Sequence, residues 1–390
     1  MTERTPTRAR SLPTPGARRA TVIGAGSFGT ALAVVLARGG LRTTLQARTA
    51  EQAQELASER DNRRYLPGVE LPAQLRIEPA SAGVARADYV FLAVPSQGLE
   101  SVIAGLSDAG LGRRTAVVSV AKGLVPPTGT PPTAVLSTAF GAHRVACVGG
   151  PAHAQEMVHA GAGLVAASKD EELAAQLAQV FMRAGVVCER SNDPLGVELA
   201  GAAKNAAALA AGATEAQGLN AAGAAAGHIF AEVWRYAESL GARPESMIGL
   251  AGAGDLVATA LAKESRNRRA GELLAAGVPA SEIPAMIGQA VEALQSVPLL
   301  ARALEHAGGE GPTGRNGAEG ANGDNARRES RAPITSALGR LISGELPLAE
   351  WVALVRTTAP PPARWRRREG TAESFWLRLW LRLRRTPRKR

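Results

Sequence analysis

The chain has 390 residues, more than one ordinary domain holds, and we expect two domains that each bury a hydrophobic core. Its formal net charge is +10, but residues 1–20 carry +4 and residues 358–390 carry +9, which leaves −3 for the rest. That mildly acidic body argues against a nucleic-acid groove, and no run reaches the roughly 18 apolar residues of a membrane-spanning helix. The two cysteines, Cys147 and Cys188, suggest neither a metal site nor a disulfide framework. We therefore expect a cytoplasmic protein that holds no metal ion and binds no nucleic acid.

Residues 1–19 are rich in arginine, threonine and proline and are predicted to form a disordered tail. From Ala20 an apolar, strand-like run leads into a glycine motif and then into a helical stretch that ends near Arg38. The motif is Gly24-Ala-Gly26-Ser-Phe-Gly29, a G-x-G-x-x-G that closes a strand and opens a helix. The first glycine permits the tight turn, the second lets the backbone approach a pyrophosphate, and the third packs the helix on the sheet. This stretch predicts a dinucleotide-binding site.

The second predicted strand, residues 43–47, ends at Arg48. An acid at that place would hold the ribose 2′-hydroxyl of NAD, whereas an arginine tolerates or favours the 2′-phosphate of NADP. We therefore expect NADP to be accepted. Residues 62–69 follow, and their asparagine, arginines, proline and glycine predict a polar, turn-rich connection.

The rest of a largely buried sheet is predicted from apolar runs at residues 87–94, 115–120, 144–148, 163–167 and 185–189. Lys122 follows one of these strands. Because ligands of open α/β sheets bind at the carboxyl ends of the strands, Lys122 is expected to meet one. Another strand leads into Gly-Gly-Pro-Ala-His-Ala at residues 149–154, where we interpret His153 as structural or exposed rather than catalytic.

A helix of small residues is predicted from Asp193-Pro194, a capping residue followed by a first-turn proline, to Gly212. Side chains this small let other backbones come close. The second half of the helix carries one charged residue, Lys204, although only five of the 45 basic residues of the chain are lysines. Unlike an arginine, a partly buried lysine can lose its proton. We interpret Lys204 as an acid–base group, the alternative being a lysine that reaches solvent.

Beyond Lys204 the pattern is helical. After a helix at residues 221–240, a tight glycine-rich loop at residues 249–256 is expected to present Asp255. Ser265 is predicted to cap a helix that ends at residue 276, and Arg266 and Asn267 in its first turn favour an anion. Residues 308–331 lack apolar residues at helical spacing and are predicted to be a disordered insertion. That spacing resumes at residues 333–355.

Several uncommon motifs occur in one order over roughly residues 20–356: GAGSFGTALA, NRRYLPG, AVPS, AKGL, GGPAHAQE, GVELAGAAKN, GLAGAGDL, SRNRR and GQAVEA. In these motifs the chain resembles NAD(P)-dependent glycerol-3-phosphate dehydrogenase of the bacterial type. The resemblance implies an α/β fold, in which an N-terminal Rossmann-type doubly wound sheet is followed by an all-helical C-terminal domain. We place the dinucleotide-binding domain at residues 20–192, the helical substrate and catalytic domain at residues 193–356 and a basic tail at residues 357–390.

This resemblance also implies an activity and a site. The family reduces dihydroxyacetone phosphate reversibly to sn-glycerol 3-phosphate for phospholipid synthesis, with NADP(H) or NAD(H), and Lys204 takes the place of the proton donor or acceptor. The substrate-binding positions that it implies are Lys122, Gly150, Ala152, Lys204, Asp255, Ser265, Arg266 and Asn267. The cofactor-binding positions are Gly24, Gly26, Ser27, Phe28, Gly29, Arg48, Lys122, Ala154, Arg266, Ala290 and Glu292.

The chemistry of the residues agrees with that assignment. Hydride delivered to a ketone leaves an alkoxide, which needs a proton and a positive charge, and Lys204 can supply both. A second ammonium, Lys122, would lower the pKa of Lys204, and Asp255 would orient it.

The chain departs from the family pattern at several positions. They are Gln46 for tryptophan, Gly149 for serine, Ala152 for serine or threonine, Ala222 and His228 for basic residues, and Ala293 for glycine. Ala152 removes a hydroxyl expected near the substrate, so we expect an altered affinity. No departure removes the proposed acid–base or phosphate groups.

Other functions and partners stay open. Another two-domain NAD(P)-dependent dehydrogenase, acting on a hydroxy acid, would give no reason for Ser265-Arg266-Asn267, and an inactive cofactor-binding module would give none for the intact Lys122, Lys204 and Asp255. The oligomeric state is open, with a homodimer as one option. In residues 375–385 the arginines and the apolar residues separate at helical spacing, so the tail either contacts an anionic membrane surface weakly or has no partner.

Overall fold

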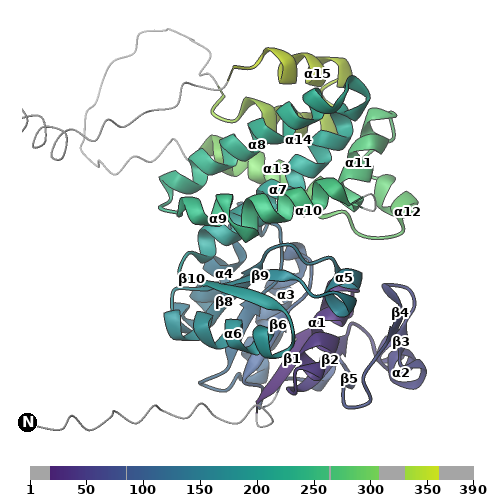
Figure 1. Ribbon diagram of the computed structural model, residues 1–390, viewed down its shortest axis with the longest axis vertical. Helices are drawn as coiled ribbons and strands as arrows, with labels where there is room; N and C mark the ends of the chain where they lie inside the picture. The colour runs from purple at the N-terminus through teal and green to yellow at the C-terminus, as the bar shows by residue number, and fades with distance from the viewer. Residues whose placement is uncertain (1–17, 85, 263–264, 307–329, 360–390) are drawn as a thin grey trace, which may run out of the picture. The chain divides into compact units, whose positions relative to one another are not determined.

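The computed structural model describes residues 18–84, 86–262, 265–306 and 330–359. Nearly all of the predicted tails and of the predicted insertion at residues 308–331 lies outside the described residues. The described chain up to Thr357 forms one compact unit, in which strands and helices alternate first and helices alone follow (Figure 1). Within these ranges, no helix combines the length and the apolar character that crossing a membrane requires.

Eight strands form one sheet in the order β10-β9-β8-β7-β6-β1-β2-β5. They are β1 (Arg19–Ile23), β2 (Arg42–Ala47), β5 (Arg76–Pro79), β6 (Tyr89–Leu92), β7 (Ala116–Ser119), β8 (Val145–Gly149), β9 (Gly163–Ser168) and β10 (Val187–Ser191). All neighbours are parallel except β8 and β9, so β9 and β10 run against the other six strands. The carboxyl ends of β1, β2, β6, β7 and β8 therefore share one edge, where ligands of such sheets bind.

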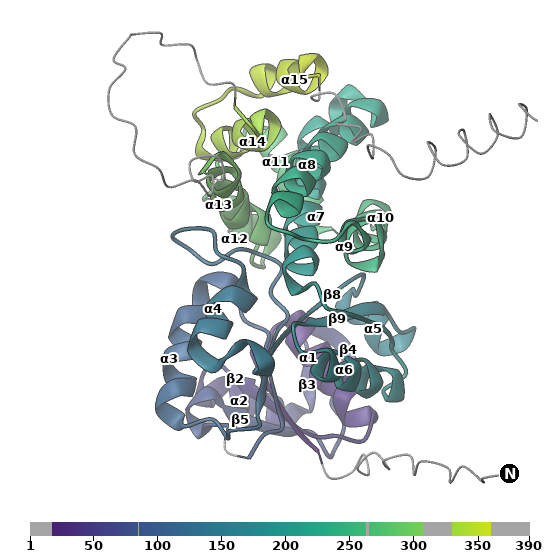
Figure 2. The ribbon, with the colours of Figure 1, turned by 90° about the vertical axis from the view of Figure 1, so that its left-hand side faces the viewer.

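Helices cover both faces of this sheet (Figure 2). They are α1 (Ser27–Arg38), α2 (Ala50–Glu59), α3 (Leu99–Ala109), α4 (Pro132–Phe140), α5 (Ala154–His159) and α6 (Glu171–Arg183). Strand β6 sends Phe91 into a core with residues of α1 and α6, and Val90 into a separate core with residues of α3 and α4. Because both faces are buried, the strand is an unbroken apolar run. The predicted doubly wound sheet is confirmed.

The stretch expected to be a turn-rich connection contains a small antiparallel hairpin, β3 (Asp61–Asn62) and β4 (Leu66–Glu70). The hairpin is separate from the main sheet. The sequence shows the turn residues plainly, but a two-residue strand is too short to give an alternating pattern.

The second part is helical, as expected. Its helices are α7 (Pro194–Thr214), α8 (Leu219–Ser239), α9 (Pro244–Ile248), α10 (Asp255–Leu261), α11 (Arg266–Ala275), α12 (Ile283–Ile287), α13 (Glu292–His306), α14 (Pro333–Ser343) and α15 (Leu348–Thr357). The Asp193 carboxylate caps α7 by accepting the Gly196 N–H at 3.0 Å, and Pro194 lies in the first turn.

The small residues of α7 let its backbone touch that of α11. A Cβ added to Gly212 of α7 would lie 2.0 Å from the Arg268 carbonyl oxygen, and one added to Gly271 of α11 would lie 2.1 Å from the Leu209 carbonyl oxygen. The expected close approach of another backbone is therefore confirmed, and it brings the start of α11 beside the middle of α7.

One expectation in this part was wrong. Residues 249–256 do not form a loop: Leu250–Gly254 makes a π-helical turn, η6, that runs directly into α10 at Asp255. Gly252 allows this wide turn to pack on α9, because a Cβ there would lie 2.0 Å from the Met247 carbonyl oxygen. Single π-helical turns occur often at functional sites, and here the turn determines where the Asp255 carboxylate lies.

Candidate active site

Lys122, Lys204 and Asp255 form a charge cluster in which Lys204 and Asp255 are buried and Lys122 is half-buried; it is called here the lysine–aspartate cluster. The Lys122 Nζ atom donates to Asp255 Oδ2 at 2.6 Å and to the Gly150 carbonyl oxygen at 3.0 Å. The Lys204 Nζ atom lies 3.5 Å from Asp255 Oδ1. Three separate elements supply these groups: the loop after β7, the middle of α7 and the first residue of α10. The cluster thus holds two ammonium groups around one carboxylate.

The hydrogen bonding of this cluster is incomplete. Asp255 Oδ1 is buried and, within the described residues, accepts no hydrogen bond, although the Lys204 ammonium faces it. Buried polar atoms in native proteins nearly always have a partner, so an unsatisfied one marks a place where a ligand can donate. The alternative, a surface lysine, is excluded for Lys204, which is 7% exposed.

Burial and neighbouring charges shift the pKa values of the cluster. Burial, followed by the nearby Lys122 ammonium, lowers the pKa of Lys204 to about 8. Lys122 was expected to lower this pKa, and burial lowers it more. For Asp255, burial by itself would raise the pKa, but Lys122 and Lys204 outweigh it and hold the pKa below its usual value. At neutral pH, Asp255 is therefore an anion and Lys204 a cation that can release its proton.

The Lys122 side chain packs against α7 at Gly201. A Cβ at Gly201 would lie 3.6 Å from the Cβ and Cγ atoms of Lys122, so the lysine passes in contact with the helix. At the same edge of the sheet, Gly150 has φ +103°, and a Cβ there would lie 2.3 Å from the Gly163 carbonyl oxygen. Only glycine can place the Gly150 carbonyl in this position, where it accepts from Lys122.

The adjacent Asn205 connects the cluster with two further elements. Its Nδ2 atom donates to the Lys122 carbonyl oxygen at 3.2 Å and to Glu292 Oε2 at 3.3 Å, and its Oδ1 atom accepts from Asn267 at 2.9 Å. The Asn267 Oδ1 atom in turn accepts the Ala293 N–H at 3.3 Å. Asn205 was not among the predicted site residues, although a polar residue in a run of alanines is a signal that could have identified it.

The start of α11 places the predicted anion-binding residues beside α7. The Ser265 hydroxyl oxygen caps the helix by accepting the Arg268 N–H at 3.4 Å, as predicted. The exposed Arg266 guanidinium donates to Gln289 Oε1 at 3.1 Å and to the Ala290 carbonyl oxygen at 3.2 Å. Because α11 has no acidic residue in its first turn, its positive end favours an anion.

The loop after β8 lies next to the cluster. Ala152 and His153 are half-buried, and His153 precedes α5, whose first residue is Ala154. Burial lowers the pKa of His153, while Lys204, Lys122 and Asp255 are close enough to act on it. His153 is thus neither exposed nor remote from the cluster.

Gly149, one of the expected departures from the family pattern, packs closely against α7. A Cβ at this position would lie only 2.7 Å from Val197 Cγ1.

The glycine motif at the end of β1 fits a dinucleotide. Gly24 has φ +113°, and a Cβ there would lie 2.4 Å from the Ala93 carbonyl oxygen; a Cβ at Gly29 would lie 2.0 Å from the Gly24 carbonyl oxygen. A Cβ at Gly26, by contrast, would meet no atom within 4 Å. Two glycines therefore close the turn and one leaves open space at the start of α1, where free backbone N–H groups attract phosphate.

The other predicted cofactor positions are spread over several elements. Ser27 and Phe28 begin α1, Arg48 is exposed directly after β2, Glu292 begins α13, and Ala290 lies two residues before it. Arg266 donates a hydrogen bond to Ala290, and Asn205 donates one to Glu292. Because Asn205 also contacts Lys122, Glu292 is connected to the lysine–aspartate cluster. Arg48 and the glycine motif follow adjacent strands, whereas no contact in the described residues links Arg48 to the cluster.

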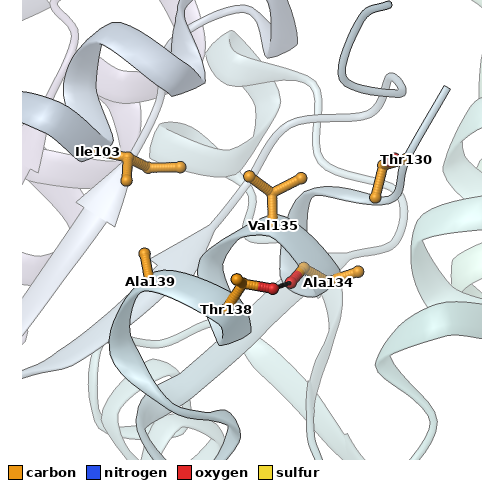
Figure 3. Close-up of a pocket in the computed structure, with 6 residues that line it drawn as sticks. All are labelled: Ile103, Thr130, Ala134, Val135, Thr138 and Ala139. Atoms are coloured by element: carbon orange, nitrogen blue, oxygen red, sulfur yellow. Dashed lines mark hydrogen bonds between the residues drawn. The ribbon is translucent and has the colours of Figure 1, made fainter. Parts of the chain in front are cut away.

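A separate pocket of about 410 Å³ lies between α3 and α4 (Figure 3). Its lining is Ile103, Thr130, Ala134, Val135, Thr138 and Ala139, and the Thr138 hydroxyl donates to the Ala134 carbonyl oxygen at 3.1 Å. None of these residues titrates, so the pocket offers no group for catalysis. The described residues likewise contain no group of three or more histidine, cysteine or acidic side chains that could hold a metal ion.

Comparison with family models matches most of the chain. A model described as the N-terminus of NAD-dependent glycerol-3-phosphate dehydrogenase matches residues 19–174, and one described as its C-terminus matches residues 193–353.

Individual proteins give the same result. A glycerol-3-phosphate dehydrogenase (NAD(P)+) from Deinococcus radiodurans is 39% identical over 286 residues, which are 72% of this chain and 83% of the relative. One from Chlorobium limicola is 40% identical over 278 residues, or 70% and 83% of the two chains. A solved glycerol-3-phosphate dehydrogenase from Coxiella burnetii has a TM-score of 0.75 at 29% identity, covering 87% of this chain and 99% of its own.

Proposed function

We propose that this chain, which belongs to the NAD-dependent glycerol-3-phosphate dehydrogenase family, reduces dihydroxyacetone phosphate reversibly to sn-glycerol 3-phosphate with NAD(P)H. The observation that carries the mechanism is the lysine–aspartate cluster: a buried Lys204 of lowered pKa whose ammonium lies 3.5 Å from Asp255 Oδ1, an oxygen that accepts no hydrogen bond within the described residues. Dihydroxyacetone phosphate brings a carbonyl for the lysine, a hydroxyl for the free carboxylate oxygen and a phosphate for the start of α11.

We assign the proton transfer to Lys204. A bound nicotinamide supplies the hydride for the carbonyl carbon, and the carbonyl oxygen then needs a proton. The Lys204 ammonium donates that proton in the reduction, and the neutral amine accepts it in the oxidation. A pKa of about 8 lets one side chain serve both directions near neutral pH.

The two lysine ammonium groups stabilise the negative charge that develops on the alkoxide oxygen. Lys122 and Lys204 bring two positive charges against the one negative charge of Asp255, and Glu292 also acts on Lys204. Lys204 and Asp255 are buried and the Lys122 side chain is 19% exposed, so these charges act more strongly than they would in water. Asp255 holds the Lys122 ammonium at 2.6 Å and leaves its second oxygen for the substrate. The Gly150 carbonyl contacts Lys122 from the loop after β8, and we assign Ala152 of the same loop to the substrate site.

We assign the substrate phosphate to Ser265, Arg266 and Asn267 at the start of α11, and the cofactor to the glycine motif, Ser27, Phe28, Arg48, Lys122, Ala154, Arg266, Ala290 and Glu292. The support for the phosphate site is the positive helix end together with a guanidinium beside it. One Nδ2 hydrogen of Asn267 is used by Asn205, so Asn267 has a single hydrogen left for the phosphate.

The test is a spectrophotometric assay of NADPH and NADH oxidation with dihydroxyacetone phosphate as substrate. We expect turnover with this ketone and little with dihydroxyacetone, which lacks the phosphate. Equal rates with the two ketones would contradict the phosphate site, and absence of turnover with both cofactors would contradict the activity. A screen of 2-keto acids in the same assay separates this activity from that of a hydroxy-acid dehydrogenase.

For the location, we propose the cytoplasm, where a reducing environment keeps thiols free. In the described part of the chain both cysteines are buried and unpaired. Cell fractionation checks this.

For the assembly we propose a homodimer on family resemblance alone. Sedimentation velocity distinguishes a dimer from a monomer.

The membrane contact of residues 375–385 is proposed from sequence alone, because these residues lie outside the described ones. The full chain should sediment with phosphatidylglycerol vesicles at low salt and be released at high salt, since arginines near anionic lipid contribute about 1 kcal/mol each. A chain that ends at Ala359 should stay in solution and keep its dehydrogenase activity. Equal sedimentation of the two chains would contradict the contact.

A further inference from the structure

We infer that Asn62 is a positioning residue for the cofactor: its side chain fixes the peptide between Ala25 and Gly26, so that the Gly26 N–H faces the pyrophosphate. The inference rests on the proposed function, because it deepens the dinucleotide site. Asn62 lies in the β3–β4 hairpin, which is outside the main sheet and has no part in the mechanism derived above.

The contacts of Asn62 are buried and specific. The residue is 3% exposed, and its Nδ2 atom donates to the Ala25 carbonyl oxygen at 3.1 Å and to Thr30 Oγ1 at 2.8 Å. Because a carbonyl can only accept, the atom that faces Ala25 must be the amide nitrogen, and both of its hydrogens are used. One side chain thus joins the hairpin to the glycine motif and to the first turn of α1.

Because the peptide is planar, the contact at the Ala25 carbonyl also sets the direction of the Gly26 N–H. The Ala25 carbonyl and the Gly26 N–H belong to one planar trans peptide, so the two groups point in opposite directions. When Asn62 holds the carbonyl toward the hairpin, the N–H must point away from it. Within the described residues, no acceptor takes the Gly26 N–H, and a Cβ at Gly26 would find open space. A free donor beside open space at a helix start is the arrangement that a phosphate uses.

A second contact ties the hairpin to another predicted cofactor segment. The Gln155 Nε2 atom donates to the Pro67 carbonyl oxygen at 2.8 Å, which joins the hairpin to α5 next to Ala154. This bond is exposed, so it constrains the hairpin less than the buried bonds of Asn62 do.

The experiment measures NADPH and NADH dissociation constants by cofactor fluorescence, together with thermal unfolding and steady-state kinetics. The variant Asn62→Leu keeps the side-chain size but removes both donors, and Asn62→Ser is the second variant in case the first does not fold. Gln74→Leu is the matched control, since it makes the same amide-to-leucine change on an exposed side chain near the hairpin. Thr30→Val removes only the second acceptor and leaves the Ala25 contact.

We expect Asn62→Leu or Asn62→Ser to raise the dissociation constant of the preferred cofactor at least tenfold, and Thr30→Val to raise it about two- to threefold. In the Asn62 variants, kcat at saturating cofactor and the KM for dihydroxyacetone phosphate should stay within about threefold, and Gln74→Leu should match the wild type. A folded Asn62 variant whose dissociation constant is within twofold of wild type would overturn the inference, and so would a lower kcat at unchanged affinity. If the wild type itself binds neither cofactor, the proposed function fails instead.

Discussion

The two halves of helix α7 each bury a titratable side chain, and the two side chains have different roles. Glu198 lies near the start of the helix and Lys204 in its middle; burial raises the pKa of the first to about 8 and lowers that of the second to about 8. Glu198 Oε1 accepts the Thr133 N–H at 2.8 Å, and Oε2 lies 2.5 Å from the Thr133 hydroxyl. Lys204 instead lies 3.5 Å from Asp255 Oδ1, which accepts no hydrogen bond in the described part of the chain.

The comparison shows that burial shifts the pKa of a side chain whether or not its hydrogen bonding is complete. Glu198 is fully satisfied by α4, and its role is to join that helix to α7. Lys204 belongs to a cluster whose bonding is incomplete and whose charge is unbalanced. Burial shifts the pKa values of both side chains. A candidate ligand site is therefore distinguished by hydrogen-bonding groups that have no partner in the protein and can bind a ligand.

The largest effect is expected from removing the Lys204 ammonium, the proposed proton donor. Lys204→Ala should lower turnover by about 10²- to 10⁴-fold, the usual contribution of a general acid or base. The NADPH dissociation constant should stay within a few-fold, because the glycine motif lies in the other part of the chain. Lys204→Arg should fail similarly, since a guanidinium does not release its proton. A Lys204→Ala variant that keeps more than a third of wild-type turnover would remove Lys204 from the mechanism.

Arg266→Ala extends the comparison to an exposed cation. Loss of a charged hydrogen bond of about 1.5 to 3 kcal/mol should raise the KM for dihydroxyacetone phosphate by about 10- to 100-fold. The rate with dihydroxyacetone should change much less, because that ketone has no phosphate to bind. Equal losses with both substrates would show that Arg266 does not bind the substrate phosphate and acts only on the cofactor or on the protein.

The pH profiles of the two reaction directions test the state of Lys204 directly. With a pKa of about 8, Lys204 carries the proton needed for reduction below pH 8 and lacks it above. The kcat/KM for reduction should therefore fall about tenfold per pH unit above pH 8, and that for oxidation about tenfold per unit below it. Profiles that bend in the same direction for both reactions would contradict the assignment.

Arg48→Glu should shift the cofactor preference by a smaller factor. An acid directly after β2 repels the 2′-phosphate of NADPH and accepts the ribose hydroxyl of NADH, so the NADPH to NADH ratio of kcat/KM should fall several-fold. Turnover with saturating NADH should persist, since Arg48 has no contact with the cluster in the described residues. An unchanged ratio would show that this strand end does not face the adenosine ribose.

Glu198→Gln should have the smallest effect on turnover, within about twofold, because an amide can keep both contacts with Thr133. Its effect is on stability. Folded Glu198 keeps its proton up to pH 8, whereas the unfolded carboxyl loses it near pH 4.5, so the wild type loses stability as pH rises between these values, by up to about 1.4 kcal/mol per pH unit. Denaturant unfolding from pH 5 to 8 should show a flatter dependence in the variant. A steep loss of turnover would instead place Glu198 among the functional groups.

Much of the fold follows from local sequence patterns. The glycine motif, the buried strands, the Asp193 cap, the helix of small residues and the Ser265 cap were predicted from the sequence and are found, because each depends on neighbours within a few residues along the chain. The chemistry of Lys204 was also accessible, since a lysine among alanines in a chain that favours arginine is a local anomaly.

Tertiary structure alone decided which groups meet. Asp255 was expected on a loop, but a π-helical turn brings it to two lysines that lie 133 and 51 residues earlier in the chain. Asn205 was not singled out, because its partners Lys122, Asn267 and Glu292 come from three other segments. Likewise, the sequence predicted only a turn-rich connection at Asn62, whereas the structure shows that its side-chain amide donates to the Ala25 carbonyl oxygen. Hydrogen bonds and burial of this kind join residues far apart in sequence, so no pattern along the chain records them; the sequence supplied the reactive groups, and long-range packing determined their partners.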